Sequence, residues 1–353
     1  MKDTAEITLE IKPKSRFEMI PVKDRLAESF GNLLAEFQQH IYYSYHTTAG
    51  YIDPLTASRL NHSPSSMKAY VESFQRLFPP NAGYFHDRID LRDELTADEK
   101  LNEPKNCDAH LTYIGCGLRN CVTYPNRNDM PVFFIDLDGT NKGRSRNRRT
   151  TVVGYNREEP AGSCRLVVPV TDHSIDTVNL RDPDLGLYES LQEELQRRGV
   201  RHGRIDLRLD RSDRNAGLTV NEFETLLMKH DLHEVIRDPL KFMAEKGKHL
   251  YQKPNLVFSK LRGYAHYDVV RIIQKMIDSM GLKESFFEEI LYNFMAYPAS
   301  RRLSMKRSLS LLVREEDGKC RIVQGRYQSP ILIQWSRAEK DQRILNASFT
   351  SFR

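Results

Sequence analysis

Apolar side chains recur at helical spacing along several stretches of the chain. Leu187, Leu191 and Leu195, for example, are four residues apart and share one face of a helix. The stretch 67–77 has the same kind of pattern and is followed by the prolines at 79–80, which end a helix. We predict helices over these segments: 26–37, 67–77, 187–198, 221–230, 267–279 and 284–296.

Segments rich in β-branched and aromatic residues predict strands and gather in two blocks. The predicted strands of the first half are 7–13, 41–45, 111–118, 131–137, 149–155 and 163–170. Those of the second half are 204–210, 305–313, 319–324, 329–335 and 343–350. Both halves run strand, helix, strand, helix and then a group of strands, which predicts an α+β fold with segregated strands.

The parallel order of elements suggests an internal repeat. Ala49-Gly50 and Ala216-Gly217 each follow a β-type segment, and aligning the two pairs places His46 opposite Asp213. Identity between the halves is low, so both a duplication and a chance likeness remain open at this point.

Composition excludes several classes of protein. The 353 residues are 39% hydrophobic and 29% charged, which is typical of a globular protein with a core. No apolar run is long enough to span a bilayer, and the five cysteines are odd in number, so we expect no membrane segment and reduced thiols in the cytoplasm. A net charge of +5 permits anionic ligands without requiring nucleic acid.

Histidines are the first candidates for chemistry. His46, His86 and His110 could together hold a divalent metal such as zinc, leaving a position for water or substrate. Asp87 and Asp108 could orient a ring or accept a proton. Spacings of 40 and 24 residues mean that only the fold could unite the three, so unrelated core or surface histidines remain an alternative.

The segment from Val132 to Thr140 reads VFFIDLDGT and resembles the opening motif of haloacid-dehalogenase phosphatases. In that class the first aspartate, here Asp136, is a nucleophile and the second, Asp138, a general acid. The Gly- and Arg-rich sequence that follows lacks the helix this class requires. A strand ending in a turn at Asp138-Gly139 is therefore the alternative.

Basic residues follow this segment closely. Arg144, Arg146, Arg148 and Arg149 could bind a phosphorylated small molecule, because guanidinium groups bind phosphate through paired hydrogen bonds. A nucleic-acid surface and a solvated strand end are the alternatives.

Taken together, the motifs of the first half resemble the YjbQ family, also described as thiamine-phosphate-synthase-like. The resemblance rests on three segments in the family's order: His46-Thr47-Thr48-Ala49, Tyr84-Phe85-His86 and Asn106-Cys107-Asp108-Ala109-His110-Leu111. The second half is similar to the same family at other places, namely Ala216-Gly217-Leu218-Thr219-Val220-Asn221-Glu222 and Gly325-Arg326-Tyr327-Gln328.

The resemblance implies a tandem fusion of two YjbQ-like domains, residues 1–158 with the histidines and residues 159–353, diverged, with a helical insertion around 235–300. It implies a β-sheet core flanked by helices, a homo-oligomer, and a metal at the histidines. It also implies an enzyme acting on a small phosphorylated metabolite, with at best weak thiamine-phosphate synthase activity.

Each half keeps family motifs that the other lacks. A composite site built from both halves would explain this pattern, and so would decay of the second half with a single site in the first. A non-catalytic ligand-binding or assembly protein is the alternative function.

Overall fold

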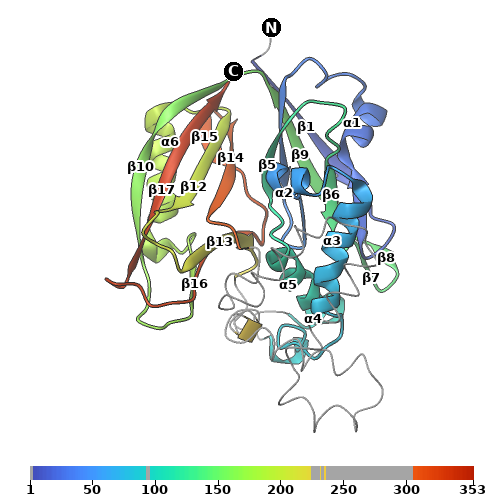
Figure 1. Ribbon diagram of the computed structural model, residues 1–353, viewed down its shortest axis with the longest axis vertical. Coiled ribbons are helices and arrows are strands. Elements are labelled where there is room, and N and C mark those ends of the chain that lie inside the picture. The colour runs from blue at the N-terminus through green and yellow to red at the C-terminus, as the bar shows by residue number, and fades with distance from the viewer. Residues whose placement is uncertain (1–2, 93–95, 224–230, 232–233, 236–304) are drawn as a thin grey trace.

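The computed structural model describes residues 3–92, 96–223, 231, 234–235 and 305–353. Its strands form two groups that lie side by side, with the two ends of the chain close together (Figure 1). In the described part of the chain, no sheet combines strands from before residue 156 with strands from after it. The fold is α+β, with antiparallel sheets and helices packed against them.

The first group of strands forms a four-stranded sheet in the order β1-β9-β3-β5 and a three-stranded sheet in the order β2-β6-β4. Its strands are β1 (Thr4–Ile11), β2 (Glu18–Pro21), β3 (Gln39–Ser44), β4 (Ala49–Gly50), β5 (Cys121–Pro125), β6 (Phe133–Asp136), the β7 (Thr140–Asn141) and β8 (Arg144–Ser145) hairpin, and β9 (Arg148–Tyr155). Its helices are α1 (Val22–Phe30), α2 (Pro54–Arg59), α3 (Pro64–Leu77), η1 (Ile89–Leu91), α4 (Ala97–Asn102) and α5 (Cys107–Gly115).

The second group forms a five-stranded sheet, β10-β17-β12-β14-β15, and a three-stranded sheet, β11-β16-β13. Its strands are β10 (Glu158–Pro169), β11 (Asp176–Asn179), β12 (Gly203–Leu209), β13 (Ala216–Asn221), β14 (Ser308–Glu316), β15 (Lys319–Ile322), β16 (Ser329–Gln334) and β17 (Gln342–Phe352). Its helices with described ends are η2 (Pro183–Leu185) and α6 (Leu187–Arg198).

The two groups repeat one strand order and one register. In the chain order of each group, the first strand pairs with the last and the third strand pairs with the last. Ala49 of β4 lies opposite Asp136 of β6, and Ala216 of β13 lies opposite Gln334 of β16 in the matching position. The alignment of Ala49-Gly50 with Ala216-Gly217 therefore agrees with the strand pairing.

Both groups contribute to a shared interior. Ile331 and Ile333 of β16 belong to the core that fills the first group, and Phe352 of β17 stacks on Tyr155 with ring centroids 4.0 Å apart. The fully buried Gln328 of the second half also hydrogen-bonds to the first half, because its amide donates to the carbonyl oxygens of Ser44 and His46. The loop that carries His46 is thus held by the second group.

The predictions for α3 and α6 are confirmed, and most predicted strands appear within a few residues of their expected bounds. The strand predicted over 111–118 is wrong, because residues 107–115 form α5, and every one of its residues is buried. A helix buried on all sides has no polar face, so its sequence lacks the helical period.

Two further expectations differ from the structure. The helix predicted over 26–37 stops at Phe30, because Gly31 adopts a φ of 60°. The hairpin turn lies at Lys142 and Gly143, with φ of 50° and 75°, rather than at Asp138-Gly139. The segments 224–230, 267–279 and 284–296 and the proposed insertion at 236–300 lie outside the described residues. Within the described part of the chain, no helix has the length and apolar character needed to cross a bilayer.

Candidate functional site

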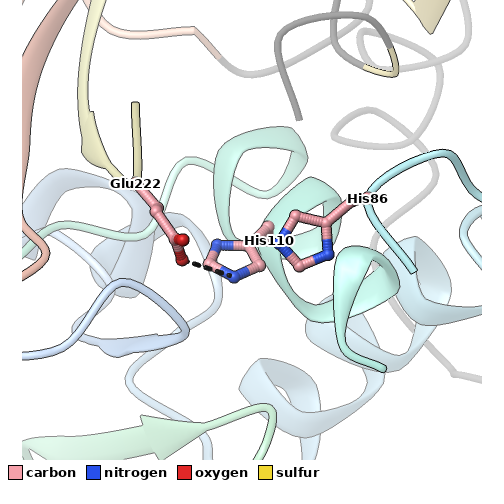
Figure 2. A group of neighbouring side chains, drawn as sticks. All are labelled: His86, His110 and Glu222. Atoms are coloured by element: carbon pink, nitrogen blue, oxygen red, sulfur yellow. Dashed lines mark ion pairs between the residues drawn. The ribbon is translucent and has the colours of Figure 1, made fainter. Parts of the chain in front are cut away.

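Three side chains from distant parts of the sequence meet between the two groups of strands. His86 precedes η1, His110 lies on α5, and Glu222 directly follows β13 (Figure 2). One ligand atom from each lies within 4.8 Å of the others, and among the described residues these three form the group suited to a metal ion. The site thus combines two predicted histidines with a carboxylate from the second half.

His110 is fixed in one protonation state by its surroundings. Burial, the main cause, lowers the pKa of His110 well below its usual range, so the ring is neutral. Its Nδ1 lies 2.7 Å from Oδ1 of Asn221, and its Nε2 lies 3.6 Å from Oε2 of Glu222. An amide oxygen only accepts, so Nδ1 carries the proton and Nε2 presents its lone pair to Glu222.

His86 is arranged in the same way. Its Nδ1 lies 3.2 Å from Oδ1 of Asp87, an oxygen that also accepts the backbone N–H of Cys107 at 3.1 Å. The carboxylate orients the ring with Nδ1 as the donor. The Nε2 atom of His86 is buried and has no hydrogen-bond partner among the described residues.

The arrangement places two imidazoles and a carboxylate within reach of a single ion. Nε2 of His110 lies 3.6 Å from the carboxylate of Glu222, and His86 offers a ligand atom within 4.8 Å of both. Acceptors buried against one another are unfavourable unless a proton or a cation lies between them. Two imidazoles and a carboxylate form a ligand set that zinc takes in catalytic sites, with an open position left over.

Further contacts hold these ligands in place. Arg92, which is buried, donates to Glu222 at 3.4 Å and to Glu103 at 3.0 Å. Asp231 accepts the backbone N–H of His86 at 2.8 Å and the thiol of Cys107 at 3.3 Å. Burial raises the pKa of the Cys107 thiol, so this cysteine is a hydrogen-bond donor and not a nucleophile.

His46 lies outside the group formed by the other two histidines. Its Nε2 accepts the backbone N–H of Arg149 at 2.8 Å. In the second half, Asp213 accepts the backbone N–H of Ile344 at 2.8 Å with its carboxylate. Arg149 and Ile344 each follow a buried arginine, so the aligned residues His46 and Asp213 make the same contact. His46 therefore stabilises the backbone at Arg149 through a hydrogen bond that needs no metal.

The buried His46 should make the free energy of unfolding depend on pH. Burial, helped by Arg148 and Arg146, lowers the pKa of His46 to about 3. In the unfolded chain the ring titrates near its ordinary value, so below about pH 6.5 the unfolded state binds the extra proton and the folded protein loses stability. We expect His46→Asn, which keeps an acceptor, to lose less stability than wild type between pH 7 and pH 5. Urea unfolding at both pH values measures this, and equal losses would contradict it.

The two aspartates of the phosphatase-like motif are engaged in ion pairs. Asp136 is fully buried, and its carboxylate accepts Nε of Arg148 at 2.7 Å and Nη2 at 2.9 Å. Asp138 pairs with Arg146 and accepts the amide of Asn106 at 2.8 Å. The motif sits in an antiparallel sheet and leads into a hairpin, and the next elements along the chain are strands and not a helix. The phosphatase interpretation is therefore wrong.

The remaining predicted residues take varied places. Asp108 forms a paired salt bridge with Arg16, with both distances 2.8 Å, and does not touch the histidines. Arg149 lies over the ring of Tyr45, 4.1 Å from its centroid, and Arg144 is exposed on β8. The charge of Arg146, which pairs with Asp138, contributes to the lowered pKa of both His46 and His110.

Sequence reasoning missed Glu222, Asn221, Arg92 and Arg16 as site residues. The available signal for the first two was the segment that ends in Asn221-Glu222, which matches the family motif missing from the first half. Arg92 and Arg16 carry no motif, and only the fold shows their partners.

Comparisons with known proteins give structural neighbours of YjbQ type. No protein-family model matches the chain, and no curated protein matches it. One solved structure, from Sulfolobus solfataricus, is described as a YbjQ-like protein of unknown function; it is 13% identical, covers 55% of this chain and 99% of its own, and has a TM-score of 0.30. A YjbQ/UPF0047 family protein from Clostridium acetobutylicum is 12% identical over 54% of this chain and 99% of its own, with a TM-score of 0.27.

A conserved hypothetical protein from Thermus thermophilus is 16% identical over 54% of this chain and 99% of its own, with a TM-score of 0.26.

Proposed function

We propose that this chain binds a divalent metal, zinc above all, through His86, His110 and Glu222, and acts on a small phosphorylated molecule. The observation that carries the proposal is that ligand atoms of two histidines and a carboxylate lie within 4.8 Å of one another, with Nε2 of His86 buried and without a hydrogen-bond partner among the described residues. A bound cation satisfies all three ligands at once.

Zinc in such a setting acts as a Lewis acid and lowers the pKa of bound water. The chain's own residues prepare the site: Asp87 and Asn221 orient the two imidazoles, and Arg92 holds the carboxylate of Glu222. These supporting contacts raise metal affinity and fix the ligand geometry.

A phosphorylated substrate is proposed from the charge beside the site. Arg146 has a side chain one-third exposed and lies close enough to lower the pKa of His110. A guanidinium group in this position can bind a phosphate group next to the metal. Thiamine-phosphate synthesis is one reaction of this class, and phosphoester and pyrophosphate compounds are the substrates to screen.

We also propose that the two halves are diverged copies of one YjbQ-like domain, fused in tandem. The repeated strand order supports this, as does the equivalence of His46 with Asp213. In the aligned sequence, Pro54-Leu55 stands where the second half has Asn221-Glu222. The first half supplies the histidines and the second half supplies the asparagine and the glutamate, which favours one composite site per chain.

Metal content by mass spectrometry on tag-free protein tests the proposal. We expect one zinc per chain in wild type, none in His86→Ala or His110→Ala, and full content in His46→Asn and in the exposed control His173→Ala. Absence of metal after dialysis against zinc would overturn the metal site. The alternative function, a non-catalytic ligand-binding or assembly protein, would then be favoured.

A further inference from the structure

Asn221 makes three contacts in the interior of the site. Its Oδ1 lies 2.7 Å from Nδ1 of His110 and accepts the backbone N–H of Glu222 at 2.8 Å. Its Nδ2 donates to the carbonyl oxygen of Thr47 at 3.2 Å. The side chain is 1% exposed, so no bulk water competes for these bonds.

The orientation of this amide follows from its two backbone partners. Glu222 offers an N–H, which requires the amide oxygen, and Thr47 offers a carbonyl, which requires the amide nitrogen. The atom that faces His110 is therefore the oxygen, and a flipped amide would lose both backbone bonds. Backbone geometry thus decides the tautomer of a side chain on another element.

The tautomer matters because His110 has a competing state. With its proton on Nε2 instead, the ring could donate to the carboxylate of Glu222, which lies 3.6 Å away. That state satisfies both groups without a metal and removes the lone pair that a metal needs.

We infer that Asn221 is a positioning residue that holds His110 in its metal-binding tautomer and excludes the competing His110–Glu222 hydrogen bond. This inference rests on the proposed metal site. Asn221 also joins the site to the loop of His46, because its amide nitrogen binds Thr47 in that loop. The second half therefore supplies both a ligand and the group that prepares a ligand of the first half.

Two variants separate orientation from simple packing. Asn221→Leu is similar in size but offers His110 no acceptor, so the ring is free to adopt the other tautomer. Asn221→Asp keeps an acceptor for Nδ1–H, loses the donor to Thr47 and adds a carboxyl group to the site. We expect Leu to lower zinc affinity about 10- to 100-fold and Asp to stay within about threefold of wild type, as for other groups that orient metal-binding histidines.

Two measurements are made on the full chain. Zinc affinity is measured by competition with a chromophoric chelator, and the tautomer of His110 by ¹⁵N NMR of metal-free protein labelled at histidine. We expect the Nδ1–H form in wild type and Asn221→Asp, and the Nε2–H form in Asn221→Leu.

The outcomes distinguish the two proposals. An Nε2–H signal for His110 in metal-free wild type would overturn the role of Asn221 even if Asn221→Leu does not fold. Equal zinc affinity in wild type and a folded Asn221→Leu would also overturn it while leaving the metal site intact. Failure of wild type to bind zinc, together with the Nδ1–H tautomer, would remove the metal site and leave the orientation by Asn221 in place.

Discussion

Replacing Glu222 by glutamine is expected to lower zinc affinity by more than about 100-fold, beyond the loss caused by removing a group that only orients a ligand. The substitution keeps the shape of the side chain and removes the carboxylate charge that would attract a cation to the two histidines. Competition with a chromophoric chelator measures the change.

The same variant should lose the stabilisation that zinc confers. A ligand present at about 1,000 times its dissociation constant stabilises the folded state by about 4 kcal/mol. Because His86 and His110 come from the first half and Glu222 from the second, the metal would join the two halves directly. Addition of zinc should raise the thermal unfolding temperature of wild type clearly, and that of Glu222→Gln much less.

Glu103 offers a matched control. It also accepts a hydrogen bond from Arg92, at 3.0 Å, but is not part of the metal-type group. Glu103→Gln therefore removes a neighbouring charge without removing a ligand, and it should bind zinc within a fewfold of wild type. Equal losses in the two variants would mean that general charge, and not coordination by Glu222, attracts the metal.

The second large effect concerns the buried pair of Asp136 and Arg148. Asp136→Gln is expected to lower the free energy of unfolding by about 3 kcal/mol, because it removes the carboxylate that binds the buried Arg148 and leaves only Asp138, 3.9 Å away, as an anionic partner. Arg148 is 3% exposed and cannot reach water to recover its hydration. Urea unfolding followed by circular dichroism measures the loss.

The second half suggests how the loss can be recovered. There, Gln334 stands in the place of Asp136, and the carboxylate that pairs with Arg343 comes from Asp213, the residue aligned with His46. The double variant His46→Asp, Asp136→Gln recreates this arrangement in the first half. We expect it to regain most of the stability lost by Asp136→Gln alone. A double variant no more stable than the single one would contradict the equivalence of the two halves.

Local signals predicted the elements that have one buried and one solvated face. Helices α3 and α6 could be predicted because their apolar residues recur at helical spacing among polar ones. Helix α5 could not be predicted, because all of its residues are buried. The residues around Leu111 and Ile114 have strand-like sequence and pack in the core on every side of the helix. That helix carries His110, so the sequence placed a site residue on the wrong kind of element.

The sequence by itself determined the α+β order of elements, the repetition of that order, and two of the three proposed metal ligands, because these depend on patterns within short segments. Only the tertiary structure decided that His46 contacts a backbone N–H, that Asp136 and Asp138 are paired with arginines, and that Glu222 completes the group. Residues 110 and 222 meet because two strand groups pack against each other. That packing depends on contacts across the whole interface between the halves, so no short segment of the sequence predicts it.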